Sequence, residues 1–183
     1  MEDLGEFLRI VGRLKRLPRT GWLECLIDEP ESVADHSFRT AVLVMVLADL
    51  ENLNVDKAIR MALLHDLAEA EIGDLTPEAK KVMGEKYARI EKEAFRRILS
   101  DLPENLAEYY LSLIEEYRAA STSEAKLVSE ADKAEMLLQA LEYEDEYGEL
   151  SRLKRFWETD LDNDLRELLR MEKQKKICSR FKS

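Results

Sequence analysis

Apolar side chains recur every three to four residues along almost the whole chain, and this spacing constrains the fold more than any other feature. No stretch alternates polar and apolar residues between turn residues, which is the pattern typical of strands. Glycine and proline, the residues that most disfavour helix interiors, number only six and four. The sequence therefore predicts an all-α protein. Its 183 residues correspond to about one domain, so we expect a single domain over residues 1–183.

Individual helices follow from the same spacing and from capping residues. Ser32 followed by Asp35 matches a capping box, and the helix that it opens is apolar on nearly all sides, which predicts a central position. Thr76-Pro77 matches an N-cap with proline at the first helical position. The segment 17–30 is expected to be irregular. The helix that Ser32 opens is expected to end at about residue 50. The remaining expected helices cover about 5–15, 55–71, 85–101, 103–119, 123–147 and 150–159, with a C-terminal helix at about 161–178.

Composition excludes several functional classes. The net charge of −11 argues against a nucleic-acid-binding protein, which usually carries a basic surface. The two cysteines, Cys25 and Cys178, are too few for a disulfide framework and suggest reduced thiols in a cytoplasmic protein. The longest apolar run, 41–48, is too short to span a membrane, and the acidic start of the chain does not match a secretory signal.

Histidines and carboxylates interrupt three segments that otherwise resemble core helices. His36 and the pair His65-Asp66 lie in two of them, and Asp132 lies on the apolar face of a third. A carboxylate in a buried run is unfavourable unless it is paired or binds a metal. The four side chains suit a divalent cation such as Mn²⁺, Co²⁺, Fe²⁺, Zn²⁺ or Mg²⁺. Spacing alone leaves a buried network of salt bridges as the alternative.

Two more acids follow this group. Glu69 lies four residues after His65 and is expected on the same helix face, and Asp74 follows in a turn. Next to a metal site, such acids fit general acid and base groups or ligands of a second cation. The alternative is that both are surface charges at a helix end.

The pattern His36, His65-Asp66 and Asp132 resembles the signature of HD-domain metal-dependent phosphohydrolases. A more specific resemblance, over about residues 5–160, is to the HD-domain-containing protein 2 group of 5′-deoxynucleotidases, which is related to bacterial YfbR. The segments that carry it are Leu17–Trp22, Pro30–Ser37, Ala62–Glu69, Ile72–Asp74, Ser123–Lys126 and Leu141–Glu144.

This resemblance implies an HD-domain helical bundle with the metal among its central helices. It implies a homodimer that hydrolyses 2′-deoxynucleoside 5′-monophosphates to deoxynucleoside and phosphate. Position by position, the resemblance assigns three sets of residues. The metal ligands are His36, His65, Asp66 and Asp132; the acid or base groups, or ligands of a second cation, are Glu69 and Asp74; the substrate contacts are Asp74, Leu75, Thr76 and Pro77.

The bacterial branch places an Arg-Trp pair beside the sugar and the phosphate, and this chain departs from that pattern. Trp22 matches the tryptophan, but Gly21 precedes it, so Arg19 is the nearest source of a guanidinium. We expect Arg19, with Lys80 or Lys81, to offset the acidic site for a phosphate dianion. Two other enzyme activities remain open, a phosphodiesterase and a nucleoside triphosphohydrolase. A helical interaction module without catalysis is the third alternative.

Overall fold

The structure is a computed structural model that describes residues 4–148, 151–162, 165–167, 169–171 and 173. Over these residues it is helical, and the one sheet-like feature is an isolated antiparallel bridge between Pro18 and Ser32. The all-α prediction is therefore confirmed. The elements are α1 (Leu4–Arg13), η1 (Leu14–Arg16), α2 (Thr20–Glu24), α3 (Val33–Leu50), α4 (Val55–Leu64), α5 (Glu69–Ile72), α6 (Pro77–Met83), α7 (Glu85–Leu99), α8 (Glu104–Arg118), α9 (Ser123–Tyr147) and η2 (Ser151–Glu158).

Both predicted N-caps are present. The Ser32 hydroxyl accepts a hydrogen bond from the Asp35 backbone N–H, and the Asp35 carboxylate accepts one from the Ser32 backbone N–H. This reciprocal pair satisfies N–H groups that the first helical turn leaves without partners. The Thr76 hydroxyl accepts from the Ala79 backbone N–H at the start of α6, with Pro77 at the first position.

Two segments differ from the sequence expectation. The five-residue helix α2 lies inside the segment expected to be irregular. The helix expected over 55–71 is interrupted, because α4 ends at Leu64 and the chain forms turns until α5 begins at Glu69. In this interval the backbone hydrogen bonds join residues three apart, as in Leu67 N–H to Leu64 O and Glu69 N–H to Asp66 O.

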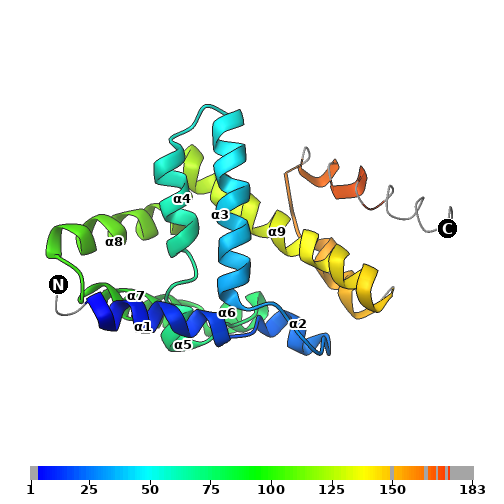
Figure 1. Cartoon of the computed structure of the whole chain (residues 1–183), viewed down its shortest axis with the longest axis horizontal. Coiled ribbons are helices and arrows are strands. Elements are labelled where there is room, and N and C mark those ends of the chain that lie inside the picture. Colours follow the sequence, from blue (N-terminus) through cyan, green and yellow to red (C-terminus); the bar gives the residue numbers. More distant parts are fainter. Residues whose placement is uncertain (1–3, 149–150, 163–164, 168, 172, 174–183) are drawn as a thin grey trace. The chain divides into compact units, whose positions relative to one another are not determined.

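The chain forms two compact units, one up to Val128 and one from Ser129 onward, with α9 contributing to both. In the first unit, α3 packs along α4, and α4 also contacts α8. Helices α1, α5, α6 and α7 form a group through mutual contacts, and Figure 1 shows this group near the N-terminal end of α3. Because His36 lies in the first turn of α3, this end of the helix positions the site.

Helix α3 is apolar on nearly all sides, as the sequence indicates, but only one of its faces is buried. One face carries the buried residues Val33, His36, Thr40, Val44 and Ala48. The opposite face exposes a run of large apolar side chains, which we call the α3 apolar stripe. Its members and their exposed fractions are Phe38 (70%), Val42 (42%), Met45 (40%), Val46 (47%) and Leu50 (73%).

In the second unit, the later part of α9 is followed by η2, so the helix expected over 150–159 is present in the 3₁₀ form. Leu161 and Asp162 are irregular, and helical residues begin at 165; the end of the expected C-terminal helix lies outside the described residues. Leu141, Leu153 and Leu161 are buried in this unit. Among the helices of the described residues, none is both long and apolar enough to cross a membrane.

Candidate metal centre

Three of the four predicted metal ligands converge within the first unit. The Oδ2 atom of Asp66 lies 3.2 Å from Nε2 of His65 and 3.7 Å from Nε2 of His36. The two imidazole rings have their centroids 5.5 Å apart. Both histidines are buried, His36 completely, and the side chain of Asp66 is 12% exposed. The start of α3 and the turn after α4 therefore bring two nitrogen atoms and one carboxylate oxygen together.

The protonation state of His65 can be inferred from its second ring nitrogen. Its Nδ1 lies 2.6 Å from the carbonyl oxygen of Ala62. Because a carbonyl oxygen only accepts hydrogen bonds, Nδ1 carries a proton, which leaves Nε2 as the ring nitrogen that can face a metal beside Asp66. A backbone carbonyl in this role is the usual way in which a ligating histidine is oriented.

This group of atoms fits a divalent cation. The Nε2 atoms of His36 and His65 and the Oδ2 atom of Asp66 face one another in a buried site, which is unfavourable unless a proton or a cation lies among them. Imidazole nitrogen with carboxylate oxygen suits Zn²⁺, Fe²⁺, Co²⁺ and Mn²⁺, and a site with few protein ligands leaves positions for water and substrate. The chemistry of these side chains therefore agrees with metal binding.

Arg19 adds a positive charge to this group. Its Nη1 donates a hydrogen bond of 3.0 Å to Oδ2 of Asp66, the same oxygen that faces the histidines. Burial works against a charge on Asp66. The imidazole of His65, the Arg19 guanidinium and His36 outweigh that cost and hold the pKa of the Asp66 carboxyl well below its usual value. Asp66 is therefore an anion, as a metal ligand must be.

Glu69 lies in a different environment. It is 2% exposed, its Oε1 accepts a hydrogen bond of 3.0 Å from Lys80 Nζ, and its Oε2 is buried without a hydrogen-bond partner among the described residues. Burial and the negative charge of Asp66 raise the pKa of Glu69 to about 9, although Lys80 opposes the shift. A buried carboxyl with a raised pKa can hold a proton near neutral pH, which a general acid requires.

Lys80 connects Glu69 to the aromatic side chain of Tyr87. Burial disfavours the ammonium, but attraction to Glu69 and Asp66 is stronger and raises the pKa of Lys80 above its usual value. The Nζ atom also lies 5.6 Å from the centroid of the Tyr87 ring, within cation–π range. Lys80, on α6, is thus a positive charge held in place by Glu69 and Tyr87.

Asp74 joins the turn after α5 to the start of α2. Its Oδ2 accepts a hydrogen bond of 2.5 Å from the Thr20 backbone N–H, and its backbone oxygen accepts one of 2.8 Å from the Thr20 hydroxyl. Gly73, at φ +81°, allows the chain to turn just before Asp74. The next three predicted substrate contacts differ in exposure, since Leu75 is half-buried, Thr76 is buried and Pro77 is exposed.

Trp22 is buried in the first unit, with 1% of its surface exposed. Its indole N–H donates a hydrogen bond of 2.9 Å to Oε1 of Glu31. This bond satisfies the polar edge of the ring and orients it. The predicted contact of Trp22 with a sugar stays a prediction.

Asp132, the fourth predicted ligand, lies on α9 in the second unit and is half-buried. Its place among the ligands stays a prediction from the sequence pattern. The sequence analysis assigned no role to Thr20, Glu31 or Tyr117. Thr20 and Glu31 lie within the segments Leu17–Trp22 and Pro30–Ser37 that carry the family resemblance, whereas no sequence signal pointed to Tyr117, whose ring lies edge-on at 5.9 Å from that of His65.

Known proteins resemble this chain over most of its length. The chain is 46% identical over 157 residues to the 5′-deoxynucleotidase HDDC2 of Bos taurus, which covers 86% of this chain and 76% of that protein. It is 42% identical over 154 residues to the 5′-deoxynucleotidase hdd1 of Schizosaccharomyces pombe, covering 82% of this chain and 77% of that protein.

Solved structures share the fold. A conserved hypothetical protein of Pyrococcus furiosus is 37% identical, with a TM-score of 0.76 over 93% of this chain and 98% of that chain. The crystal structure of a metal-dependent phosphohydrolase of Magnetospirillum magnetotacticum, so named by prediction, has a TM-score of 0.70 at 23% identity over 96% of this chain and 94% of that one. The sequence also matches the HD domain family over residues 11–168. From this match, and from the histidines and aspartate that meet between α3 and α4, we conclude that the chain belongs to the HD domain family.

Proposed function

We propose that this protein is a metal-dependent 5′-deoxynucleotidase that hydrolyses 2′-deoxynucleoside 5′-monophosphates to deoxynucleoside and phosphate. The observation that carries the proposal is the convergence of His36, His65 and Asp66 with the Arg19 guanidinium. Relatives at 46% and 42% identity over most of the chain bear the name 5′-deoxynucleotidase, which supports the substrate class.

We propose His36, His65, Asp66 and Asp132 as the metal ligands, with Glu69 and Asp74 as acid or base groups or as ligands of a second cation. A bound divalent cation would supply a water of lowered pKa and neutralise phosphate oxygens; Mn²⁺, Co²⁺, Fe²⁺, Zn²⁺ and Mg²⁺ all suit these ligands. The presence of Asp132 in this set is supported by the sequence signature that it completes.

The side chains around the metal ligands have two further roles, protonation of the leaving group and binding of the phosphate. Hydrolysis forms a bond between a water oxygen and phosphorus and breaks the bond between phosphorus and the 5′ oxygen, which needs a proton as it departs. Glu69, buried and held by Lys80, donates that proton. Arg19 holds Asp66 and presents a guanidinium to the phosphate, for which planar, charge-assisted hydrogen bonds are well suited.

The sugar and the remainder of the nucleotide contact the residues that follow the Asp74 turn. Leu75, Thr76 and Pro77 line the substrate, and Trp22 lies against the deoxyribose. The hydrogen bonds between Asp74 and Thr20 support this placement, because they hold the loop that carries Arg19 and Trp22 against the Asp74 turn.

The whole chain, residues 1–183, acts as one HD domain in this proposal, because the family match at 11–168 runs through both compact units. We place the protein in the cytoplasm, where its two cysteines stay reduced and its nucleotide substrates occur. It acts on small molecules and has neither a nucleic-acid nor a membrane partner.

The protein forms a homodimer through the α3 apolar stripe. The stripe has Phe38 and Leu50 at its two ends and Val42, Met45 and Val46 between them. Two antiparallel copies related by a two-fold axis would set each Phe38 near the C-terminal end of the partner helix, and the two valines would let the helices approach closely. Exposed apolar side chains grouped in this way mark interaction surfaces.

The test is phosphate release from deoxyadenosine monophosphate by wild-type protein and by Asp66→Ala, each with added Mn²⁺, Co²⁺ or Mg²⁺. The wild type should release phosphate only with metal, and Asp66→Ala should lose both activity and bound metal, which elemental analysis of the purified protein measures. Asp49→Ala is the matched control, because Asp49 is an exposed carboxylate on α3. Wild-type turnover by Asp66→Ala would show that the metal-centre assignment is wrong.

A further inference from the structure

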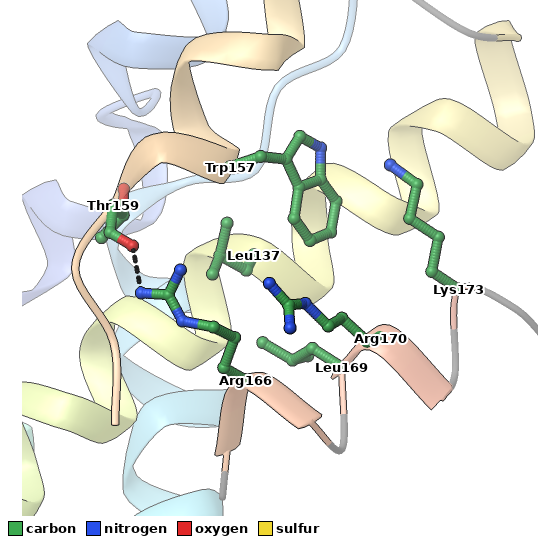
Figure 2. Close-up of a pocket in the computed structure, with 7 residues that line it drawn as sticks. All are labelled: Leu137, Trp157, Thr159, Arg166, Leu169, Arg170 and Lys173. Atoms are coloured by element: carbon green, nitrogen blue, oxygen red, sulfur yellow. Dashed lines mark hydrogen bonds between the residues drawn. The ribbon is translucent and has the colours of Figure 1, made fainter. Parts of the chain in front are cut away.

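The second unit contains a pocket of its own, with a volume of 270 Å³. Leu137 of α9 and Trp157 of η2 form part of its wall, and Arg166, Arg170 and Lys173 supply three cationic side chains (Figure 2). No carboxylate lines it among the described residues. Two of these cations pair with carboxylates outside the lining, Lys173 with Glu144 at 2.9 Å and Arg166 with Asp160 at 3.7 Å, so Arg170 carries the positive charge that is not balanced within the described part of the chain. Such a lining attracts an anion.

Trp157 is held in one orientation. Its indole N–H donates a hydrogen bond of 3.0 Å to Oε1 of Glu144. Lys173 forms an ion pair of 2.9 Å with the same carboxylate and places its Nζ 4.0 Å from the centroid of the indole ring. Glu144 thus neutralises Lys173 and fixes the ring, so the indole is a rigid, flat wall.

The two arginines differ in how much of their hydrogen-bonding capacity the protein uses. Nη2 of Arg166 donates to the backbone oxygens of Thr159 at 3.1 Å and of Leu161 at 3.3 Å, the first of which is drawn in Figure 2. These bonds fix the direction of the guanidinium. Arg170 is exposed and forms no hydrogen bond or ion pair within the described part of the chain. Its guanidinium can therefore bind a ligand without breaking an existing contact.

The remaining lining is apolar. Leu137 is 4% exposed and Leu169 is 2% exposed, so both belong to the core of this unit and give the pocket a fixed floor. An inorganic ion would contact the arginines but would leave this floor and the indole uncovered. The volume lies slightly below the range of about 300–1,000 Å³ that is usual for drug-sized ligands, which favours a compact ligand.

We propose that this pocket binds a small organic anion, a phosphate or carboxylate attached to a compact flat apolar body. The anionic group pairs with the guanidinium of Arg170 next to that of Arg166, since guanidinium donors match both oxyanions. The apolar body packs against Trp157 and the two leucines. None of these residues belongs to the proposed metal centre, so the proposal stands independently of the nucleotidase activity.

The experiment is a titration of the full-length protein with small anionic probes. Binding is followed by NMR through the side-chain indole N–H signals of the tryptophans. The chain has two tryptophans, and Trp157→Phe assigns which signal belongs to the pocket. The probes are phenylphosphonate and benzoate, which are not hydrolysed. Two control probes are used: benzyl alcohol, which lacks the charge, and inorganic phosphate, which lacks the apolar body. We expect phenylphosphonate or benzoate to shift the Trp157 signal to saturation, and the stronger of the two identifies the preferred anionic group.

Arg170→Gln should weaken that binding by at least about tenfold, as expected for the loss of a charge-assisted hydrogen bond. Lys154→Gln is the matched control, because it removes one positive charge from an exposed position on η2 outside the pocket, and it should bind like wild type. The proposal is overturned by any of three results: no saturation up to about 10 mM probe, equal affinity of Arg170→Gln and wild type, or equal affinity for inorganic phosphate and phenylphosphonate.

Discussion

At the scale of single residues, Asp66 and Glu69 are close in sequence, but their environments shift their pKa values in opposite directions. Cationic neighbours keep Asp66 ionised, whereas burial and the charge of Asp66 favour the protonated form of Glu69. Pairs of carboxyl groups with opposite shifts are typical of sites that need both an anion and a proton donor. This contrast supports Asp66 as a ligand and Glu69 as an acid.

Glu69→Gln should lower turnover by about 10²-fold or more, the usual effect of losing a general acid or base. Glutamine keeps an oxygen that can accept the hydrogen bond from Lys80, so the structure is retained while proton transfer is lost. Steady-state phosphate release measures the effect, with Glu78→Gln on α6 as an exposed control. An unchanged rate would reduce Glu69 to a structural acid, and a partial rescue by added metal would identify it as a ligand of a second cation.

Trp22 and Arg19 should affect substrate selection differently. Trp22→Ala should narrow the preference for deoxynucleotides over ribonucleotides more than it lowers the rate on the better substrate. Because Trp22 is buried, the alanine variant also costs about 3–5 kcal/mol of stability, so Trp22→Phe serves as the better-folded comparison. Arg19→Ala should weaken both substrates equally through the shared phosphate. Equal wild-type turnover of deoxyadenosine and adenosine monophosphates would contradict the sugar contact.

At the scale of elements, the capping box of α3 fixes the helical turn that presents His36. Ser32→Ala removes the hydroxyl that accepts from the Asp35 N–H and should lower the free energy of unfolding by about 1 kcal/mol. Urea denaturation measures this change. Ser112→Ala, at an exposed position in α8, should change stability by less than about 0.5 kcal/mol. Equal effects of the two substitutions would mean that the cap contributes nothing specific.

The α3 apolar stripe makes a second prediction at this scale. Val46→Lys places a charge near the middle of the proposed dimer contact, where it would lose water, and should convert the protein to monomers. Val82→Lys introduces the same charge on α6 at a position that is 87% exposed, and the protein should remain a dimer. Sedimentation velocity at several concentrations distinguishes the two. A monomeric wild type, or a dimeric Val46→Lys, would refute the interface.

At the scale of the whole molecule, most element boundaries could be predicted because they depend on local interactions. The capping box of α3, the threonine-proline start of α6 and the long helix α9 all follow from residues within a turn of one another. The break after α4 could not be predicted in this way. The apolar spacing continues through Leu67 and no glycine or proline interrupts residues 62–72, yet α4 ends at Leu64 and hydrogen bonds between residues three apart follow it.

Sequence by itself determined the helical class and the identity of the residues with unusual chemistry, because helix periodicity and buried histidines with acidic neighbours are visible in one dimension. Tertiary structure decided which of them meet: Arg19 reaches Asp66 across 47 positions, and Thr20 reaches Asp74 across 54. It also decided that one apolar face of α3 stays exposed and that three cations of the second unit share a pocket with Trp157. The physical reason is that burial and the electrostatic effects that follow from it depend on neighbours distant in sequence, which periodicity does not specify.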